Sequence, residues 1–158
     1  HMYCECNKIQ AFWEKLFKWW EHCTTEKLDT NARTTILGIR KKNLHSQQTL
    51  FPETALPFTY LRTIAYGIIR KERFKIQKDF KHSSVNDMIK ETLQSLQKKA
   101  NMLYHKAKQW ERWNTPESKE KISHRYSISY FKECWEESGI AKITKTHTLP
   151  VIIRAQGH

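Results

Sequence analysis

Turn-forming residues are scarce in this sequence, and long apolar runs are absent. Only four glycines and four prolines occur among its 158 residues, and a many-stranded sheet would need more of both at its turns. We therefore expect long helices. No stretch approaches the roughly 18 consecutive apolar residues that span a bilayer, and the N-terminus lacks the basic and apolar segments of a secretory signal. We expect no membrane partner for this chain.

Cysteines are also few, and their spacing is not that of a disulfide framework. They are Cys4, Cys6, Cys23 and Cys134. Free cysteines are typical of reducing compartments, so we expect an intracellular protein. The chain begins at His1 rather than at an initiator Met. We interpret it as a piece of a longer protein, in which His1 and Met2 are either native or a cloning remnant.

The residue patterns of known catalytic centres are missing. A polymerase holds two metal ions about 4 Å apart with paired aspartates, whereas Asp29, Asp79 and Asp87 are isolated from one another in the sequence. There is no Gly-rich phosphate loop, no Ser nucleophile elbow and no His-Glu-x-x-His motif. His22 and Cys23 are neighbours in sequence, which is not the through-space geometry of a base and its nucleophile. We expect no catalytic residue in this segment.

Positive charge is the strongest signal in the composition. The chain has 28 Lys and Arg residues against 16 Asp and Glu residues, which gives a formal net charge of +12. Such an excess implies a polyanionic partner, and nucleic acid is favoured over an anionic membrane.

Apolar residues at helical spacing predict four helices. They cover about residues 7–22, 58–80 and 85–113, and a fourth follows the Thr115-Pro116 helix start and ends at Gly139. Residues 24–57 form a long loop. The third helix, with about 28 residues, would be about 42 Å long and would project beyond a small globule.

The predicted fold class is all-α, an irregular or orthogonal bundle of about four helices with a long loop and a loose C-terminal tail. We expect residues 1–139 to form a helical accessory nucleic-acid-binding domain. Residues 140–158 alternate loosely and contain Pro150, so we interpret them as a flexible or edge-strand tail.

A one-sided basic run at the end of the second predicted helix is the main candidate site. A solvated helical face normally carries mixed signs, but only Glu72 and Asp79 oppose the cations of this run. Clustered Lys and Arg release counterions from phosphates, which gives affinity that falls with salt. The run offers no obvious reader of base edges, so we expect backbone contact with weak sequence preference. The predicted phosphate-binding residues are Arg70, Lys71, Arg73, Lys75, Lys78 and Lys81.

A second candidate cluster interleaves aromatic rings with cations near the end of the third predicted helix. Its members are Lys106, Lys108, Trp110, Arg112 and Trp113. Bases of a single strand stack on such rings while cations track the phosphates. The same residues equally suit a helix end that docks on a neighbouring domain.

The aromatic residues of the first predicted helix are interpreted as core. Phe12, Trp13, Phe17 and Trp20 share one helical stripe, so burial explains them. Trp19 lies off that stripe, and two interpretations remain open for it. It either stacks on a base or packs under a neighbouring domain.

The N-terminal sequence HMYCECNKIQAFW resembles a segment of LINE-type (non-LTR) retrotransposon reverse transcriptases, in which a zinc-knuckle half His-x4-Cys precedes a helix that opens on Lys, Ile and Phe-Trp. The likeness continues in Leu37-Gly38-Ile39, in the aliphatic run of residues 62–75 that ends in basic residues, and in residues 84–113, which end in a Trp-rich turn. It covers about residues 1–113 and fades after Pro116.

The resemblance implies a non-catalytic C-terminal region downstream of the polymerase, within a parent that is an RNA-directed DNA polymerase with an endonuclease. The region would hold template RNA or an RNA–DNA hybrid, or brace the polymerase domain, in a ribonucleoprotein of the nucleus and cytoplasm. His1 and Cys6 match half of the knuckle, but Cys4 is not part of the family's ligand set. Because a structural zinc site needs four ligands, we expect no cofactor in this segment and zinc in the intact parent.

An alternative to nucleic acid binding is a different class of function, a helical protein–protein interaction module. The chain would then be a decayed or host-adopted retroelement fragment without a nucleic acid partner. A weaker third hypothesis is an amphipathic helix at a membrane surface. Salt dependence separates the first two, because phosphate binding weakens steeply with salt and hydrophobic docking does not.

Overall fold

The computed structural model describes residues 7–24, 26–28, 30–35, 55–113, 127–145 and 148–151. Within these ranges the fold is all-α apart from one two-stranded sheet, as the sequence predicts. In chain order, the elements are α1 (Asn7–Thr24), α2 (Ala32–Thr35), α3 (Ala55–Gln77), α4 (Val85–Trp113), α5 (Ile128–Phe131), the π-helical turn η3 (Lys132–Glu136), β1 (Ala141–Ile143) and β2 (Thr148–Pro150).

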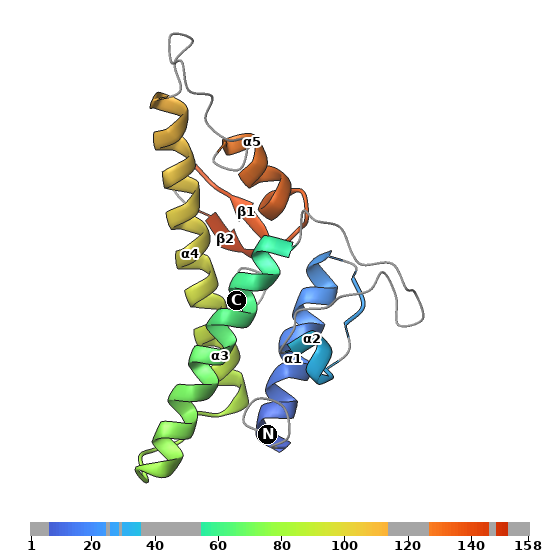
Figure 1. Ribbon diagram of the computed structural model, residues 1–158, viewed down its shortest axis with the longest axis vertical. Coiled ribbons are helices and arrows are strands. Elements are labelled where there is room, and N and C mark those ends of the chain that lie inside the picture. Colours follow the sequence, from blue (N-terminus) through green and yellow to red (C-terminus); the bar gives the residue numbers. More distant parts are fainter. Residues whose placement is uncertain are drawn as a thin grey trace.

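Helices α3 and α4 form a long antiparallel hairpin, and α1 lies beside it (Figure 1). Helix α4 has 29 residues, which corresponds to about 43 Å of length. The turn between α3 and α4 projects beyond α1 at one end of the molecule, whereas α5, η3 and the sheet lie near the other end of α4 (Figure 1). The projecting part is therefore the turn that joins the second and third predicted helices.

The boundaries of α4 match the prediction because a local cap fixes its start. The Ser84 hydroxyl accepts a hydrogen bond from the Asp87 N–H at 3.1 Å, and the Asp87 carboxylate accepts one from the Ser84 N–H at 3.4 Å. This reciprocal arrangement satisfies donors that a helix N-terminus leaves without partners.

Helix α3 spans Ala55–Gln77 rather than the predicted residues 58–80. Pro57 falls in its first turn, where the missing N–H costs nothing because first-turn donors have no partner within the helix. Asp79 has a φ of 56°, a left-handed conformation that ends the helix. The predicted loop over residues 24–57 also contains the short helix α2, and the Leu37-Gly38-Ile39 element lies outside the described residues.

The aromatic stripe of α1 forms the centre of the core, as predicted. Phe12, Trp13 and Trp20 are fully buried and Phe17 is 2% exposed. The Trp20 and Phe58 ring centroids lie 5.1 Å apart in an edge-on contact, which joins α1 to α3. Such ring pairs stabilise the fold beyond the area that they bury.

Trp19 corrects the prediction for its position. Its side chain is only 4% exposed, and its ring packs edge-on against Trp20 at 6.4 Å. It belongs to the core of this domain, so neither base stacking nor a neighbouring domain explains it. The helical stripe marked it as outward-facing, but the α1 surface is covered on more than one side.

The described part of the tail forms two short strands, one of the two structures expected for it. Strand β1 pairs antiparallel with β2 in the register Ala141–Pro150, and β2 packs against α4. The Asn101 side chain of α4 accepts hydrogen bonds from the Thr148 N–H and hydroxyl. Ile140 is fully buried and Ala141 is 2% exposed, so this segment shares the core of the helices.

Gly139 connects η3 to the sheet and terminates the helical segment, as expected. Its φ of +88° is one that L side chains rarely adopt, and a Cβ atom there would lie 2.2 Å from the Cys23 carbonyl oxygen. The backbone at Gly139 therefore lies close to the end of α1, where only a residue without a side chain fits. The expected start of the fourth helix at Thr115-Pro116 lies outside the described residues, which resume at Ser127.

Candidate nucleic-acid interface

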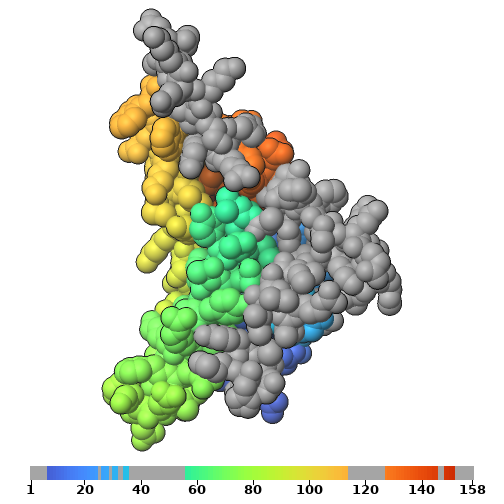
Figure 2. All heavy atoms as spheres, viewed as in Figure 1, coloured from blue at the N-terminus to red at the C-terminus, as the bar shows by residue number. Residues whose placement is uncertain are grey.

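The predicted phosphate-binding residues gather at the turn between α3 and α4. We call them the basic tip: Arg70, Lys71, Arg73, Lys75, Lys78 and Lys81. The chain reverses here because the Phe80 N–H donates to the Lys75 carbonyl at 2.9 Å and the Lys78 N–H donates to the Phe74 carbonyl at 3.0 Å. The basic tip occupies the end of the molecule that projects beyond α1 (Figure 2).

Two cations of the basic tip have carboxylate partners. Lys71 Nζ lies 2.7 Å from Glu91 Oε1 of α4, and Lys75 Nζ lies 3.9 Å from Glu72 Oε2. Lys75 also donates to the Ser83 hydroxyl at 2.8 Å. The Lys71–Glu91 pair is solvent-exposed, and pairs of this kind stabilise a fold by less than about 1 kcal/mol. These contacts hold α3 against the start of α4.

The other four cations form the open part of the basic tip. Arg70, Lys78 and Lys81 are exposed and Arg73 is half-buried. Among the described residues, no carboxylate oxygen lies within 4.0 Å of any of these four side chains. The fold therefore leaves a positive surface at this end of the hairpin, which is the condition that phosphate binding requires.

Glu72 does little to neutralise that surface because its carboxylate has internal partners. The side chain is 4% exposed, and Glu72 Oε1 accepts from Lys8 Nζ at 2.7 Å and from the Ser83 N–H at 3.0 Å. Burial acts to raise the pKa of Glu72. The bond and charge of Lys8, the Ser83 N–H and the charge of Lys75 outweigh burial, so the pKa lies below its ordinary value.

Exposed apolar side chains accompany the cations at the basic tip. Phe74 is 52% exposed, Ile76 is 48% exposed and Phe80 is 57% exposed. The Phe74 and Phe80 ring centroids lie 6.2 Å apart. Sequence reasoning missed these residues, although both phenylalanines lie within the basic run. Rings interleaved with cations are a typical surface for stacking bases and tracking phosphates.

The second predicted cluster is divided by the structure. Lys106, Trp110 and Trp113 line one pocket at the C-terminal part of α4. Lys108 instead lies over the Tyr104 ring, 5.2 Å from its centroid. Neither Lys108 nor Arg112 is among the residues that line the pocket.

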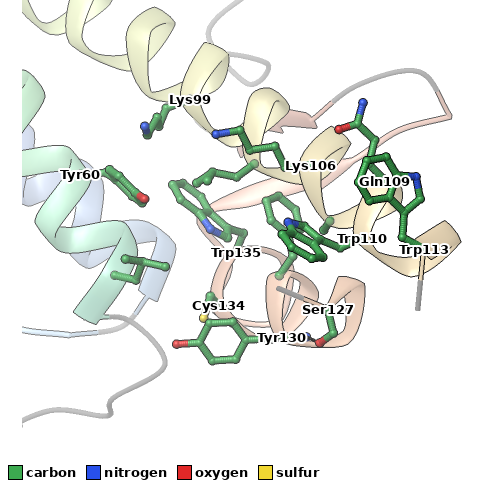
Figure 3. A pocket seen from close by; sticks show the side chains of 14 residues that line it. Tyr60, Lys99, Lys106, Gln109, Trp110, Trp113, Ser127, Tyr130, Cys134 and Trp135 are labelled. Carbon is green, nitrogen blue, oxygen red and sulfur yellow. Dashed lines mark hydrogen bonds between the residues drawn. The ribbon is translucent and has the colours of Figure 1, made fainter. Parts of the chain in front are cut away.

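The pocket has a volume of about 690 Å³ and brings together aromatic rings from four elements. Figure 3 shows Tyr60 of α3 at one side and Trp113 of α4 at the other, with Trp135 of η3 and Trp110 of α4 between them. Tyr130 of α5 lies opposite the α4 side of the pocket (Figure 3). Tyr60, Tyr130 and Trp135 were missed at the sequence level because they come from segments far apart in the chain.

The basic tip and the pocket lie toward opposite ends of α4. The tip adjoins its first residue, Val85, whereas the pocket extends to its last residue, Trp113. From Val85 to Trp110 the helix rises about 38 Å at 1.5 Å per residue. The near part of the pocket is closer, because Lys99 lies eight residues, or about 12 Å, along α4 from Glu91, the partner of Lys71.

The described residues contain no group of three or more His, Cys, Asp or Glu side chains that could hold a metal ion. The predicted partial zinc site, His1 and Cys6, lies outside the described residues. Burial raises the pKa of Cys23 to about 12. Because the thiolate is the reactive form, this burial disfavours Cys23 as a nucleophile.

The chain matches no protein-family model, no curated protein and no solved structure. Within the parts of the chain that the structure describes, no helix combines the length and apolarity needed to cross a membrane. Function is therefore inferred from the surface chemistry of the basic tip and the pocket.

Proposed function

We propose that this chain is a non-catalytic nucleic-acid-binding region that holds RNA, or an RNA–DNA hybrid, by non-specific phosphate contacts at the basic tip. The observation that carries the proposal is the set of four cations without a described carboxylate partner at the projecting end of the hairpin. Each phosphate that they neutralise releases counterions, which drives binding without reading sequence.

The shape of the hairpin favours this role. The α3–α4 turn projects from the core (Figure 1), so a strand can contact the cations without displacing α1. The ion pair between Lys71 and Glu91 joins the two helices of the hairpin. The pair therefore fixes the backbone segment that carries the open cations.

The resemblance of the N-terminal sequence to LINE-type reverse transcriptases supports a placement downstream of a polymerase domain. In that setting the chain would keep template RNA or the hybrid near the polymerase of an RNA-copying parent, as part of a ribonucleoprotein of the nucleus and cytoplasm. A zinc knuckle completed by upstream cysteines would belong to the intact parent, with His1 and Cys6 as two of its ligands.

A second candidate function, a protein–protein interaction module, is favoured by the exposed apolar side chains of the tip. Phe74, Ile76 and Phe80 are each about half exposed, and exposed apolar groups often mark a docking surface. Binding by such a surface would change little with salt, because no counterions are released.

Neutralising the open cations tests the proposed function. We expect the variant R70Q/R73Q/K78Q/K81Q of the full chain to bind a single-stranded RNA 20-mer more weakly than wild type in fluorescence anisotropy. The slope of log affinity against log salt should fall by roughly 0.7 for each phosphate contact that is lost. Lys71 and Lys75 are kept because they hold the hairpin together.

A matched control removes the same charge elsewhere. Lys18, Lys27, Lys142 and Lys145 are exposed, and they lie outside both the basic tip and the pocket. Their replacement by Gln should leave most of the salt slope in place. An equal loss in both variants would show a diffuse charge effect, and an unchanged slope in the tip variant would remove the basic tip from the interface. Either result overturns the proposal.

A further inference from the structure

The pocket at the C-terminal part of α4 has the charge and the aromatic character of a site for an anionic, aromatic ligand. Its described lining contains five Trp and Tyr side chains and two lysines, Lys99 and Lys106, and no carboxylate. Its volume of about 690 Å³ falls within the range of about 300–1,000 Å³ that is typical of ligand sites.

The floor of the pocket is buried, whereas its rim is exposed. Trp135 is 1% exposed and Phe131 is 5% exposed, and their rings are stacked with centroids 5.9 Å apart. Trp110 and Trp113 at the rim are 40% and 75% exposed. Large rings held at the mouth of a preformed cavity can stack on a planar ligand with little reorganisation.

The two lysines lie where they can contact a negative charge of a ligand whose ring stacks in the pocket. Lys99 Nζ lies 4.8 Å from the centroid of the Tyr60 ring, a cation–π contact that holds the ammonium at the edge of the cavity. Lys106 follows two turns later on the same face of α4, about 10 Å along the helix. Figure 3 shows both lysines on the α4 side of the pocket, above Trp135.

We propose that this pocket stacks bases of a single-stranded nucleic acid, with Trp110 and Trp113 against the bases and Lys99 and Lys106 on the flanking phosphates. The proposal rests on the proposed function and adds a second contact, in which Trp110 lies about 38 Å along α4 from Val85. Bases inside a duplex are stacked on one another and expose few ring faces, so the pocket selects single strands.

A tetranucleotide, which is short enough to occupy the pocket alone, tests it through variants that alter only the pocket lining. We expect the full-length chain to bind a fluorescently labelled single-stranded RNA tetranucleotide. The variant W110A/W113A should bind it about tenfold or more weakly, as expected for lost base stacking. M102A is the matched control, because Met102 is an exposed side chain of the same helix that does not line the pocket, and its affinity should equal that of wild type.

A second variant keeps the test decisive if the tryptophan variant loses helicity. Lys99→Gln with Lys106→Gln leaves every ring in place, and it should weaken tetranucleotide binding and flatten its salt dependence. A blunt RNA duplex of 12 base pairs has its bases stacked on one another, so its affinity should be the same for wild type and for W110A/W113A. An equal loss of duplex and tetranucleotide affinity in W110A/W113A, or wild-type tetranucleotide affinity in both pocket variants, would overturn base stacking in the pocket.

Failure of this inference and failure of the proposed function give different results. If the 20-mer binds and the tetranucleotide does not, the pocket is not a nucleic acid site. Phosphate binding at the basic tip is then unaffected by that result. If the 20-mer does not bind, the proposed function fails, and the pocket inference fails with it. An acidic, aromatic peptide provides a competitor. If it displaces the tetranucleotide and binds the wild-type chain more tightly than the tetranucleotide does, the ligand class is wrong.

Discussion

Glu72 Oε1 lies 2.7 Å from Lys8 Nζ, so that a buried carboxylate of α3 binds the first turn of α1. The same carboxylate accepts the Ser83 N–H from the turn that precedes α4. One acidic side chain thus connects three segments next to the basic tip. Its charge stabilises the contact of the hairpin with α1, and the open cations of the basic tip stay without a described carboxylate partner.

The pH dependence of stability should show the contribution of Glu72. Its folded pKa lies below its unfolded value, so its ionisation stabilises the fold above the unfolded pKa of about 4.3, and this contribution is lost as pH falls through the folded pKa. We expect Glu72→Gln to lower the free energy of unfolding at pH 7 and to flatten its decline between about pH 5 and pH 3. Urea unfolding at several pH values measures both effects.

Glu14→Gln is the control for that experiment. Glu14 is exposed on the same molecule, and the described residues give it no ion pair within 4.0 Å. Its replacement should leave the pH profile close to wild type. If the Glu72 and Glu14 variants gave parallel profiles, Glu72 would not be the stabilising carboxylate.

Two glycine substitutions should change stability in opposite directions. Gly139→Ala places a side chain on a residue with a φ of +88° and puts its Cβ 2.2 Å from the Cys23 carbonyl oxygen, so it should cost at least about 1–2 kcal/mol. Gly67→Ala meets no atom within 4 Å in α3, and the better helix propensity should add about 1 kcal/mol. The unfolding temperature of Gly139→Ala should therefore lie below that of wild type, and the unfolding temperature of Gly67→Ala should lie above it. A stable Gly139→Ala variant would contradict the close approach of the η3 segment to α1.

Trp19 and Trp20 should respond differently to the same change. The Trp20 indole N–H donates to the buried Glu26 carboxylate at 2.6 Å, whereas the buried Trp19 indole N–H has no hydrogen-bond partner in the described structure. Replacement by Phe removes the same atoms at both positions. Because Trp20→Phe removes a buried hydrogen bond, which contributes about 0.5–1.5 kcal/mol, it should be the more destabilising change by about that amount. Equal unfolding midpoints would show that the indole–carboxylate bond contributes nothing.

Local patterns were enough to predict most of the helical framework. Helix α4 was predicted from Val85 to Trp113 because its apolar spacing is regular and Ser84 can cap it, and both features depend only on nearby residues. Helix α1 was predicted for the same reason. The end of α3 was misplaced because the left-handed conformation of Asp79 is set by the turn as a whole.

The candidate sites were less predictable because they depend on long-range packing. The six cations of the basic tip could be read from the sequence, but the ion pairs around them join different helices. Lys71 pairs with Glu91 of α4, and Glu72 pairs with Lys8 of α1. The pocket combines Tyr60, Trp110 and Trp135, and no local period links these positions. Trp19 was misassigned because a stripe on a helical projection does not show what covers the helix from the other side.

The exposed phenylalanines of the tip provide a final prediction, which separates stacking from charge. Phe74 and Phe80 are more than half exposed, so F74S/F80S should leave the free energy of unfolding nearly unchanged. It should weaken single-stranded RNA 20-mer binding by about 1–3 kcal/mol for each base that no longer stacks. The salt slope should persist, because no cation is removed. Anisotropy titrations at several salt concentrations measure the affinity and the slope together.

Comparison with a duplex gives that prediction its control. The bases of an RNA–DNA hybrid 20-mer are already stacked on one another and present few ring faces, so the loss of Phe74 and Phe80 should change its affinity much less than that of the single strand. An equal loss for both ligands would mean that the rings position the cations rather than stack on bases. If RNA affinity were unaffected while a protein partner was lost, the exposed apolar side chains would instead serve the docking function.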